Sequence, residues 1–256
     1  MTTLRGLDDY PRPGLAVDLA ILTVTRPSAD PVLRLLVQDR DGPAGRALPG
    51  GFVRERATIA ETTADVLRRK VGIEAGSAVR PRLLRLFDDP GRDDRSWVMS
   101  AAHALTLPEQ AVAGARGDLV RVEPDGTLEG ETGLLFDHDE IVRAAVDDLR
   151  ARYEIRQRLI GVRPDPDGFL PEPFTLLQLR RVHEAVVGDR LHKDNFARRM
   201  KEWLVPEVKG GRVQSTSGLR GRPAALFRRA PQPAGHAEDR RAGTTGPIKP
   251  FCMPGG

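Results

Sequence analysis

The stretch LPGGFVRERATIAETTADVLRRKVGI, residues 48–73, is the part of this 256-residue chain that decides the fold. Residues 49–51, Pro-Gly-Gly, end a short apolar run and mark a tight turn. Beyond the turn, apolar side chains recur at helical spacing: Ile59, Val66 and Leu67. Gly72 then follows as a helix stop. The stretch therefore predicts a strand, a glycine turn and an amphipathic helix.

This spacing resembles the Nudix box. In that pattern a glycine, five residues, a glutamate and seven residues precede Arg-Glu-U-x-Glu-Glu-x-Gly-U, where U is aliphatic. Anchoring residues 50–51 at the front and residues 72–73 at the back gives a register without gaps, in which no glutamate position holds a glutamate. The first glutamate is replaced by Ala57, the Arg-Glu pair by Asp65-Val66 and the Glu-Glu pair by Arg69-Lys70.

These replacements remove the chemistry of a Nudix hydrolase. Val66, Arg69 and Lys70 are spaced i, i+3, i+4 and share one helix face, where such a hydrolase holds carboxylates around divalent cations. Because Mg²⁺ needs anionic oxygen ligands, we expect no catalytic residue and no metal ligand on this face. Glu55 and Glu61 are near in sequence but outside the ligand positions. The alternative is an ordinary amphipathic helix behind a Gly-Gly turn.

The composition is typical of a soluble protein in a reducing compartment. The single cysteine, Cys252, excludes an intramolecular disulfide framework. No apolar run approaches the length of a membrane span, and the N-terminus, with Asp8 and Asp9, has no signal-peptide core. We therefore expect a cytoplasmic location and no membrane association.

Charge is distributed unevenly along the chain. Residues 1–160 contain 23 basic and 26 acidic side chains, net −3, whereas residues 161–256 contain 17 and 10, net +7. An acidic front half joined to a basic back half favours a polyanion as the partner of the back half. An uneven surface without such a partner is the alternative.

The front half predicts a mixed sheet with two helices. The β-favouring apolar runs are residues 15–24, 32–38, 82–87 and 97–107. Only Asp18 interrupts the first run. Residues 40–46 are expected to be a loop into the box, and residues 141–152 a second helix. Strands around helices fit the α/β/α sandwich that the Nudix resemblance implies for residues 10–160.

The loop at residues 88–95 is a candidate phosphate site. Its two guanidiniums, Arg92 and Arg95, can bind phosphate through bidentate hydrogen bonds. The loop also resembles the Arg-Asp-Pro-Arg loop of the ADP-ribose branch of Nudix proteins, without its proline. A solvated turn with self-compensating charges is the alternative. The expected ligand-binding residues are Gly50, Gly51, Phe52, Arg92 and Arg95.

Residues 161–173 carry four prolines and are expected to be a linker. The sequence pattern changes after them, from predicted strands to predicted helices. Residues 174–188 predict a helix with Thr175 as N-cap and Gly188 as its end. Residues 191–204 predict a second, basic amphipathic helix that buries Phe196, Met200, Trp203 and Leu204. An apolar helix followed by a basic one is typical of a helix-turn-helix.

Two short strand candidates, residues 208–213 and 223–228, surround residues 214–222 and predict a β-wing. Residues 174–229 contain 13 basic and 5 acidic side chains, so the positive charge lies in this module. Solvated amphipathic helices without a DNA partner are the alternative. The expected DNA-binding residues are Lys193, Asn195, Arg198, Arg199, Lys201, Arg220 and Arg222.

The order of these motifs resembles the NrtR family, Nudix-related regulators of NAD metabolism. The family string Asn-Phe-Arg-Arg-Lys stands here as Asn-Phe-Ala-Arg-Arg at residues 195–199, and Arg-Gly-Arg-Pro follows at residues 220–223. The resemblance implies an α+β chain, a Nudix-like sandwich followed by a winged helix at residues 174–229. It also implies a homodimeric repressor of NAD synthesis or salvage genes that binds operator DNA and senses ADP-ribose or a related adenine nucleotide, without a cofactor.

The competing hypothesis is a Nudix-type ADP-ribose or nucleotide-sugar pyrophosphatase with a basic appendage. It would need metal ligands outside the usual positions, such as Glu55, Glu61 or Asp65. Residues 230–256 lie beyond the resemblance, are rich in Pro, Gly and charge, and are expected to be a disordered tail.

Overall fold

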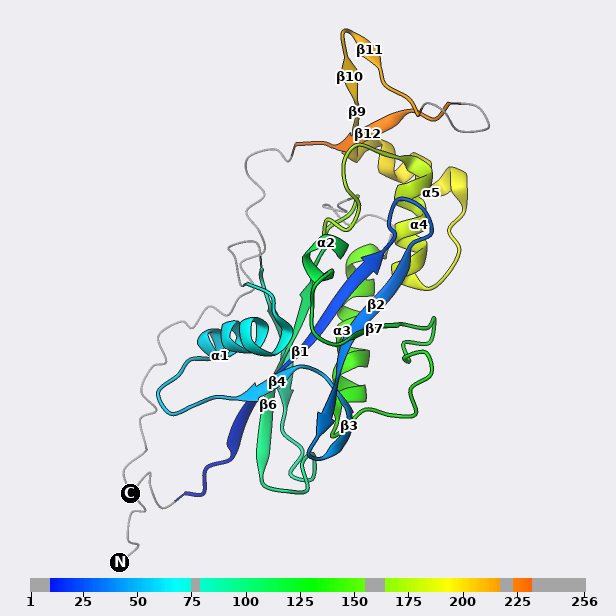
Figure 1. Cartoon of the computed structure of the whole chain (residues 1–256). Coiled ribbons are helices and arrows are strands. Elements are labelled where there is room, and N and C mark those ends of the chain that lie inside the picture. Colours follow the sequence, from blue (N-terminus) through cyan, green and yellow to red (C-terminus); the bar gives the residue numbers. More distant parts are fainter. Residues whose placement is uncertain (1–9, 75–78, 155–163, 217–222, 232–256) are drawn as a thin grey trace, which may run out of the picture.

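The computed structural model describes residues 10–74, 79–154, 164–216 and 223–231. They form two parts: a mixed sheet between helices, and a smaller part with two helices, short strands and a projecting hairpin (Figure 1). No helix in these ranges is long and apolar enough to cross a membrane.

A seven-stranded sheet forms the centre of the first part. Its main path is β3-β2-β1-β6-β5, with β4 paired to β1 and β7 to β2. The strands are β1 (Gly14–Thr25), β2 (Val32–Asp41), β3 (Ala44–Ala47), β4 (Gly50–Phe52), β5 (Arg82–Phe87), β6 (Val98–Thr106) and β7 (Asp118–Arg121). β1 is parallel to β6 and antiparallel to β2 and β4. Because β1 is central and helices cover both faces of the sheet, most of its side chains are buried, which explains its long apolar run.

Helices cover both faces of this sheet, which confirms the predicted α/β/α sandwich (Figure 1). On one face, α1 (Ile59–Asp65) continues as a π-helical segment, Val66–Val71, and ends at Gly72 with φ 81°. On the other face, α3 (His138–Tyr153) buries its apolar stripe. The short α2 (Glu109–Val112) follows β6. Each face therefore has its own core cluster, one with Val66 and Leu67, the other with Ile141 and Val146.

The second part contains the two predicted helices, α4 (Leu176–Val187) and α5 (Lys193–Met200). Thr175 caps α4 as predicted: its side chain accepts a hydrogen bond from the Gln178 amide, and the Gln178 side chain accepts one from the Thr175 amide. Gly188 ends the helix with φ 81°. The strands are β8 (Phe174–Thr175), β9 (Leu204–Pro206), β10 (Val208–Lys209), β11 (Arg212–Val213) and β12 (Leu226–Arg229). They form a β8-β12-β9 sheet and a separate β10-β11 hairpin.

The second helix is shorter than predicted. The pattern over residues 191–204 predicts one helix, but α5 ends at Met200, a 3-10 turn covers Lys201–Trp203, and β9 begins at Leu204. Leu204 lies opposite Arg229 of β12. The burial of Leu204 therefore comes from strand pairing, which overrides the continuing amphipathic pattern.

Two hairpins also correct the prediction. Residues 40–46 are not a simple loop, because β2 extends to Asp41 and pairs with β3. Residues 208–213 do not form one strand of a wing with residues 223–228. Instead β10 and β11 pair with each other across Gly210 and Gly211, whose φ angles are 57° and 73°. Glycine adopts both conformations without strain, so this Gly-Gly pair makes a tighter hairpin than predicted.

The two parts pack against each other along α3 and α4. At the end of α3, Arg150 Nε donates to the Val186 carbonyl at 3.1 Å, and the Tyr153 hydroxyl donates to Asp165 at 2.6 Å. The β1-β2 turn also contacts α4, where Gln178 Nε2 donates to the Ser28 carbonyl at 2.9 Å. The described end of the predicted linker is thus packed rather than extended.

The exact domain limits stay a prediction. Residues 155–163, which include the start of the predicted linker, lie outside the described residues, and so do residues 232–256 of the predicted tail.

Candidate ligand pocket and nucleic-acid interface

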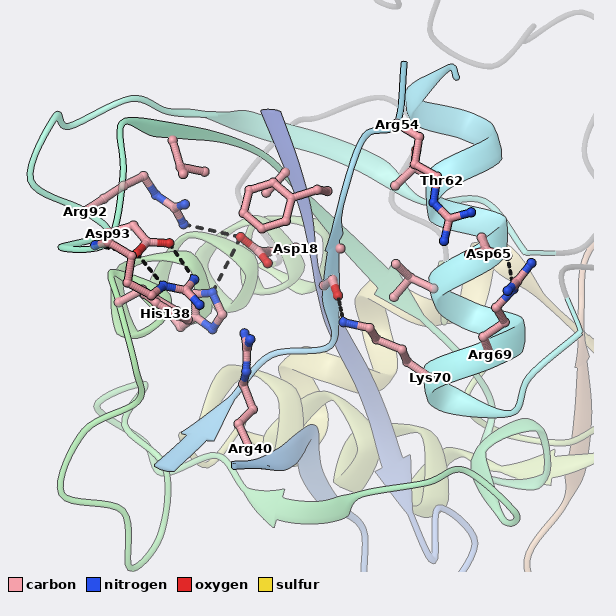
Figure 2. A pocket seen from close by; sticks show the side chains of 18 residues that line it. Asp18, Arg40, Arg54, Thr62, Asp65, Arg69, Lys70, Arg92, Asp93 and His138 are labelled. Carbon is pink, nitrogen blue, oxygen red and sulfur yellow. Dashed lines mark hydrogen bonds and ion pairs between the residues drawn. The ribbon is translucent and has the colours of Figure 1, made fainter. Parts of the chain in front are cut away.

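A cavity of about 380 Å³ lies where β4, the π-helical segment, the β5-β6 loop and the start of α3 meet (Figure 2). All five residues predicted to bind a ligand line it, so the structure brings the Gly-Gly pair and the arginine loop together. The pair is not the tight turn that the sequence predicts, because Gly50 and Gly51 are in β4 and pair with β1; we keep the name glycine turn for residues 49–51. Charged and aromatic side chains dominate the remaining lining: Asp18, Arg40, Arg54, Asp65, Arg69, Lys70, Asp93, Phe136 and His138.

Glycine is required at the turn because β4 lies close to the charged centre of β1. Gly50 is paired with Asp18, and a Cβ at Gly50 would be 2.0 Å from Asp18 Oδ1 and 2.8 Å from the Val17 carbonyl. A Cβ at Gly51 would be 3.1 Å from Val66 Cγ2. The Gly-Gly pair therefore lets the strand pass between Asp18 and the helix, while Phe52 remains 55% exposed at the rim.

Asp18 is the centre of a buried ionic network. It accepts a hydrogen bond from Ser100 Oγ at 2.7 Å and forms an ion pair with Arg92 at 3.3 Å. Burial alone would raise the pKa of Asp18, but hydrogen bonds from His138 and Ser100 and the charge of Arg92 outweigh it and lower the pKa. The one acidic residue in an apolar strand is therefore held ionised.

His138, the first residue of α3, contacts this network through one ring nitrogen. The Leu48 amide donates to His138 Nδ1 at 2.9 Å, so that nitrogen is the acceptor and the proton of the neutral ring lies on Nε2. His138 Nε2 is 3.5 Å from Asp18 Oδ2. The main chain before the glycine turn therefore fixes the tautomer of a histidine in the cavity wall.

The two predicted arginines are both held by carboxylates. Arg92 is 7% exposed and donates to Asp137 at 2.6 and 2.8 Å, as well as to Asp18. Burial disfavours its charged form, but Asp137 and Asp18 more than offset this and raise its pKa. Arg95 donates to Asp93 at 2.7 and 2.8 Å. Arg92 thus organises the wall, and Arg95, which is 5.1 Å from the centroid of Phe136, lies at the edge.

The helix face that carries metal ligands in Nudix hydrolases has a different chemistry here. Val66 is 4% exposed, Arg69 Nε is 2.5 Å from Asp65 Oδ1, and Lys70 Nζ donates to the Gly50 carbonyl (Figure 2). Among the described residues, no group of three or more His, Cys, Asp and Glu side chains is placed to hold a metal ion.

The two nearby glutamates do not supply the missing carboxylates. Glu61 accepts hydrogen bonds from the Thr58 amide and hydroxyl in the capping box of α1. Glu55 pairs with Arg56 on the surface and is absent from the cavity lining. The donor set of the cavity therefore fits an anion better than a divalent cation.

The predicted DNA-binding side chains are arranged along α5 and the turn after it. Lys193, Asn195, Arg198 and Lys201 are exposed. Arg198 donates to Asn195 Oδ1 at 3.1 Å, so the two side chains form a pair. Arg199 is half-buried and lines a groove between α3 and α5. Arg220 and Arg222 lie outside the described residues.

Other basic side chains of the module are on the β10-β11 hairpin, which projects from the molecule (Figure 1). Lys209 and Arg212 are exposed there, beside Val208 and Val213. Sequence reasoning missed them as contact residues because it placed the tip of the wing further along the chain. In the cavity it missed Arg40, Asp18 and His138, of which only Asp18 carried a signal, as the one charge in an apolar run.

Comparison with known proteins decides the type of the second part. Residues 168–229 match the family model of the NrtR DNA-binding winged helix domain. The winged helix is of the NrtR type. This confirms the predicted winged helix and its resemblance to the DNA-binding domain of NrtR proteins.

Relatives extend the similarity over most of the chain. The "ADPR responsive transcriptional repressor NtrR" of Acinetobacter baylyi is 29% identical over 238 residues, which cover 88% of this chain and 85% of that protein. Shewanella oneidensis NrtR has the same fold, with a TM-score of 0.61 and 24% identity over 84% of this chain and 94% of that one. A MutT/nudix family protein from Enterococcus faecalis also has this fold, with a TM-score of 0.63 and 20% identity over 87% of this chain and 90% of that one. Both parts therefore occur in the same order in solved NrtR structures.

Proposed function

We propose that this protein is a transcriptional repressor that responds to ADP-ribose or a related adenine nucleotide. The nucleotide binds the cavity of the Nudix-like part, and the NrtR-type winged helix binds operator DNA in the cytoplasm, at the nucleoid. The A. baylyi relative, whose name describes an ADPR-responsive repressor, supports this over both parts of the chain. We also propose, from the resemblance of the sequence to the NrtR family, that the regulated genes are those of NAD synthesis or salvage.

One observation carries the proposal: a preformed cavity with cations in place of catalytic carboxylates belongs to the same chain as an NrtR-type winged helix. A sensor must bind its ligand without consuming it. Arg69 and Lys70, where a hydrolase has glutamates, favour retention of an anionic ligand and oppose the activation of water by a metal.

Two sets of residues are proposed to make the contacts. The ligand-binding set is Gly50, Gly51, Phe52, Arg92 and Arg95, with Arg92 acting through the wall that it organises. The DNA-binding set is Lys193, Asn195, Arg198, Arg199, Lys201, Arg220 and Arg222.

A gel-shift assay tests the proposal directly. The full-length protein is incubated with the DNA upstream of its own gene and with random DNA of equal length, each with and without ADP-ribose. We expect preferential binding of the upstream fragment and a shift of its affinity by ADP-ribose. Equal binding of both DNAs, unaffected by ADP-ribose or other adenine nucleotides, would contradict it.

We further propose that the protein does not hydrolyse its ligand. Incubation with ADP-ribose and Mg²⁺ should leave ADP-ribose intact by chromatography. Metal-dependent release of AMP at ordinary enzyme rates would instead favour the pyrophosphatase hypothesis, with ligands such as Glu55, Glu61 or Asp65.

The repressor is proposed to act as a homodimer on a near-palindromic operator, since one winged helix makes few base contacts and two-fold repetition multiplies specificity. Light scattering of the free and DNA-bound protein measures this. A mass of one chain at high concentration and on DNA would exclude the dimer.

A further inference from the structure

The cavity holds more positive than negative charge. Its lining includes the six cations Arg40, Arg54, Arg69, Lys70, Arg92 and Arg95, against the three carboxylates Asp18, Asp65 and Asp93. Three of the cations are ion-paired with carboxylates: Arg69, Arg92 and Arg95. Within the described residues, no carboxylate lies within ion-pair distance of the other three: Arg40, Arg54 and Lys70. An uncompensated cluster of cations in a concave site attracts anions.

Lys70 has donors to spare in this cavity. Its ammonium donates to the Gly50 carbonyl, which uses one of its three N–H groups. The other two are available to a ligand between the glycine turn and the helix. Partial burial lowers the pKa of Lys70, the positive charge of Arg40 lowers it further, and Asp18 raises it.

Arg40 reaches the same space from the opposite side. It is near the end of β2, and Figure 2 shows its guanidinium between Lys70 and the Asp18–His138 network. The guanidinium lies 5.5 Å from the centroid of Phe136, which leaves its hydrogen-bonding edge unused by that contact. Two cations that repel each other across a cavity are stabilised together when an anion lies between them.

Arg54 adds a third cation at the rim. It follows the glycine turn, and Figure 2 shows its guanidinium beside Thr62 of α1, above the helix face that carries Arg69 and Lys70. The three side chains therefore come from three elements that converge on one space: β2, the segment after β4, and the π-helical segment.

We infer that Arg40, Arg54 and Lys70 bind the diphosphate of the nucleotide directly and take the place of a divalent cation, so that binding requires no metal. This inference rests on the proposed function. A diphosphate ester carries about two negative charges, which three fixed cations neutralise without Mg²⁺. An ammonium group donates hydrogen bonds to phosphate oxygens but does not produce hydroxide from bound water as a metal ion does. Protein cations in place of a metal ion would therefore bind the ligand without hydrolysing it.

Calorimetry of the full-length protein tests the inference. ADP-ribose is titrated in excess EDTA and, separately, in millimolar Mg²⁺. We expect the two dissociation constants to agree within about twofold, and Lys70→Gln to weaken binding in EDTA by roughly tenfold, the loss expected for a charge-assisted hydrogen bond. Arg40→Gln should weaken it similarly.

The matched control is Arg68→Gln. Arg68 is on the same helical segment, is exposed and pairs with Asp65, but does not line the cavity. We expect its affinity for ADP-ribose to be unchanged. Because neither Lys70 nor Arg68 belongs to the buried core, both variants should fold, and thermal melts verify this.

The possible failures are distinguishable. Binding that occurs in Mg²⁺ and disappears in EDTA would overturn the inference and leave the proposed function standing. Equal loss of affinity in Lys70→Gln and Arg68→Gln would also overturn it, since the net positive charge of the helix, rather than contacts in the cavity, would then explain the binding. No binding of ADP-ribose or any adenine nucleotide by the folded protein would overturn both the inference and the nucleotide-sensing part of the proposed function.

Discussion

At the scale of single residues, the cavity depends on contacts that leave no room for another atom. Gly50 is the clearest case, since its Cα lies against the carboxylate of Asp18 and the carbonyl of Val17. The strand pairing of Gly50 with Asp18 fixes this approach, so a side chain there can be accommodated only by moving β4.

Gly50→Ala should therefore destabilise the protein and close the cavity. A methyl group at the 2.0 Å position forces a backbone shift, and we expect the free energy of unfolding to fall by about 1–3 kcal/mol, together with loss of ADP-ribose binding. Urea unfolding measures this. Gly114→Ala is the control, because a Cβ there meets no atom within 4 Å and φ at Gly114 is not in the positive region; its stability should change by no more than about 0.5 kcal/mol.

Asp18 makes the stability of the protein depend on pH. Its pKa is lowered in the folded state, so it contributes stability above the unfolded pKa of about 4, and that contribution is lost as the pH falls through the folded pKa. Ser100→Ala removes one hydrogen bond to the carboxylate, raises the folded pKa of Asp18 and should move acid unfolding to higher pH. Circular dichroism against pH measures the midpoint. Ser96→Ala, at an exposed position, should leave it unchanged.

At the scale of elements, the sequence predicts whatever is both long and periodic. The apolar runs of β1, β2, β5 and β6, the capped α4 and the Nudix-type helix all match their patterns to within a few residues. The short strands β3, β4 and β7 are missed, because three or four residues carry no period and owe their pairing to distant partners.

The same limit applies to the site. Motif spacing predicts that the Gly-Gly pair and the arginine loop belong to the site, since the box and its register are local, but it does not predict that the pair is in a strand. Arg40 and His138 are not predicted, because β2 and the start of α3 reach the cavity only through the sheet topology. The sequence also does not predict the ion pair between Arg92 and Asp137, because the two residues are 45 positions apart.

The helix α3 connects the cavity to the winged helix. His138 at its start lines the cavity, and Arg150 near its end donates to the Val186 carbonyl of α4 and to the Glu123 carbonyl, each at 3.1 Å. One helix therefore contacts both the cavity and the winged-helix part, and we propose that it couples them.

Arg150→Ala should uncouple the two activities. We expect ADP-ribose to bind as before, because Arg150 is far along the helix from the cavity, while the change that ADP-ribose makes to operator affinity shrinks several-fold. Parallel calorimetry and gel-shift titration measure the two quantities. Arg143→Ala, at an exposed position of the same helix, is the control; an equal effect in both variants would contradict a role for this contact.

At the scale of the whole molecule, we expect charge and shape to divide the DNA contacts between α5 and the β10-β11 hairpin. Asn195 and Arg198 are paired on the exposed face of α5, where side chains can reach base edges in the major groove. Lys209 and Arg212 are on a projecting hairpin suited to phosphate contacts (Figure 1).

Asn195→Ala should relax the preference for operator over random DNA, since a bidentate contact to adenine is worth roughly 1–3 kcal/mol of discrimination. Arg212→Ala should lower the affinity for operator and random DNA alike and reduce the salt dependence of binding. Fluorescence anisotropy with both DNAs at several salt concentrations separates the effects. Full operator preference in a folded Asn195→Ala variant would show that another element reads the bases.

Val66 opposes a metal site on this helix face through its packing. It occupies a position that holds a glutamate in the Nudix pattern, yet it is 4% exposed, belongs to the core cluster beneath α1 and lies against Gly51. A glutamate there would place an ionised group in an apolar contact before any metal could compensate it. Introducing the glutamates one at a time is therefore expected to destabilise the protein before a complete ligand set is present, so side-chain packing as well as charge disfavours a metal site on this helix face.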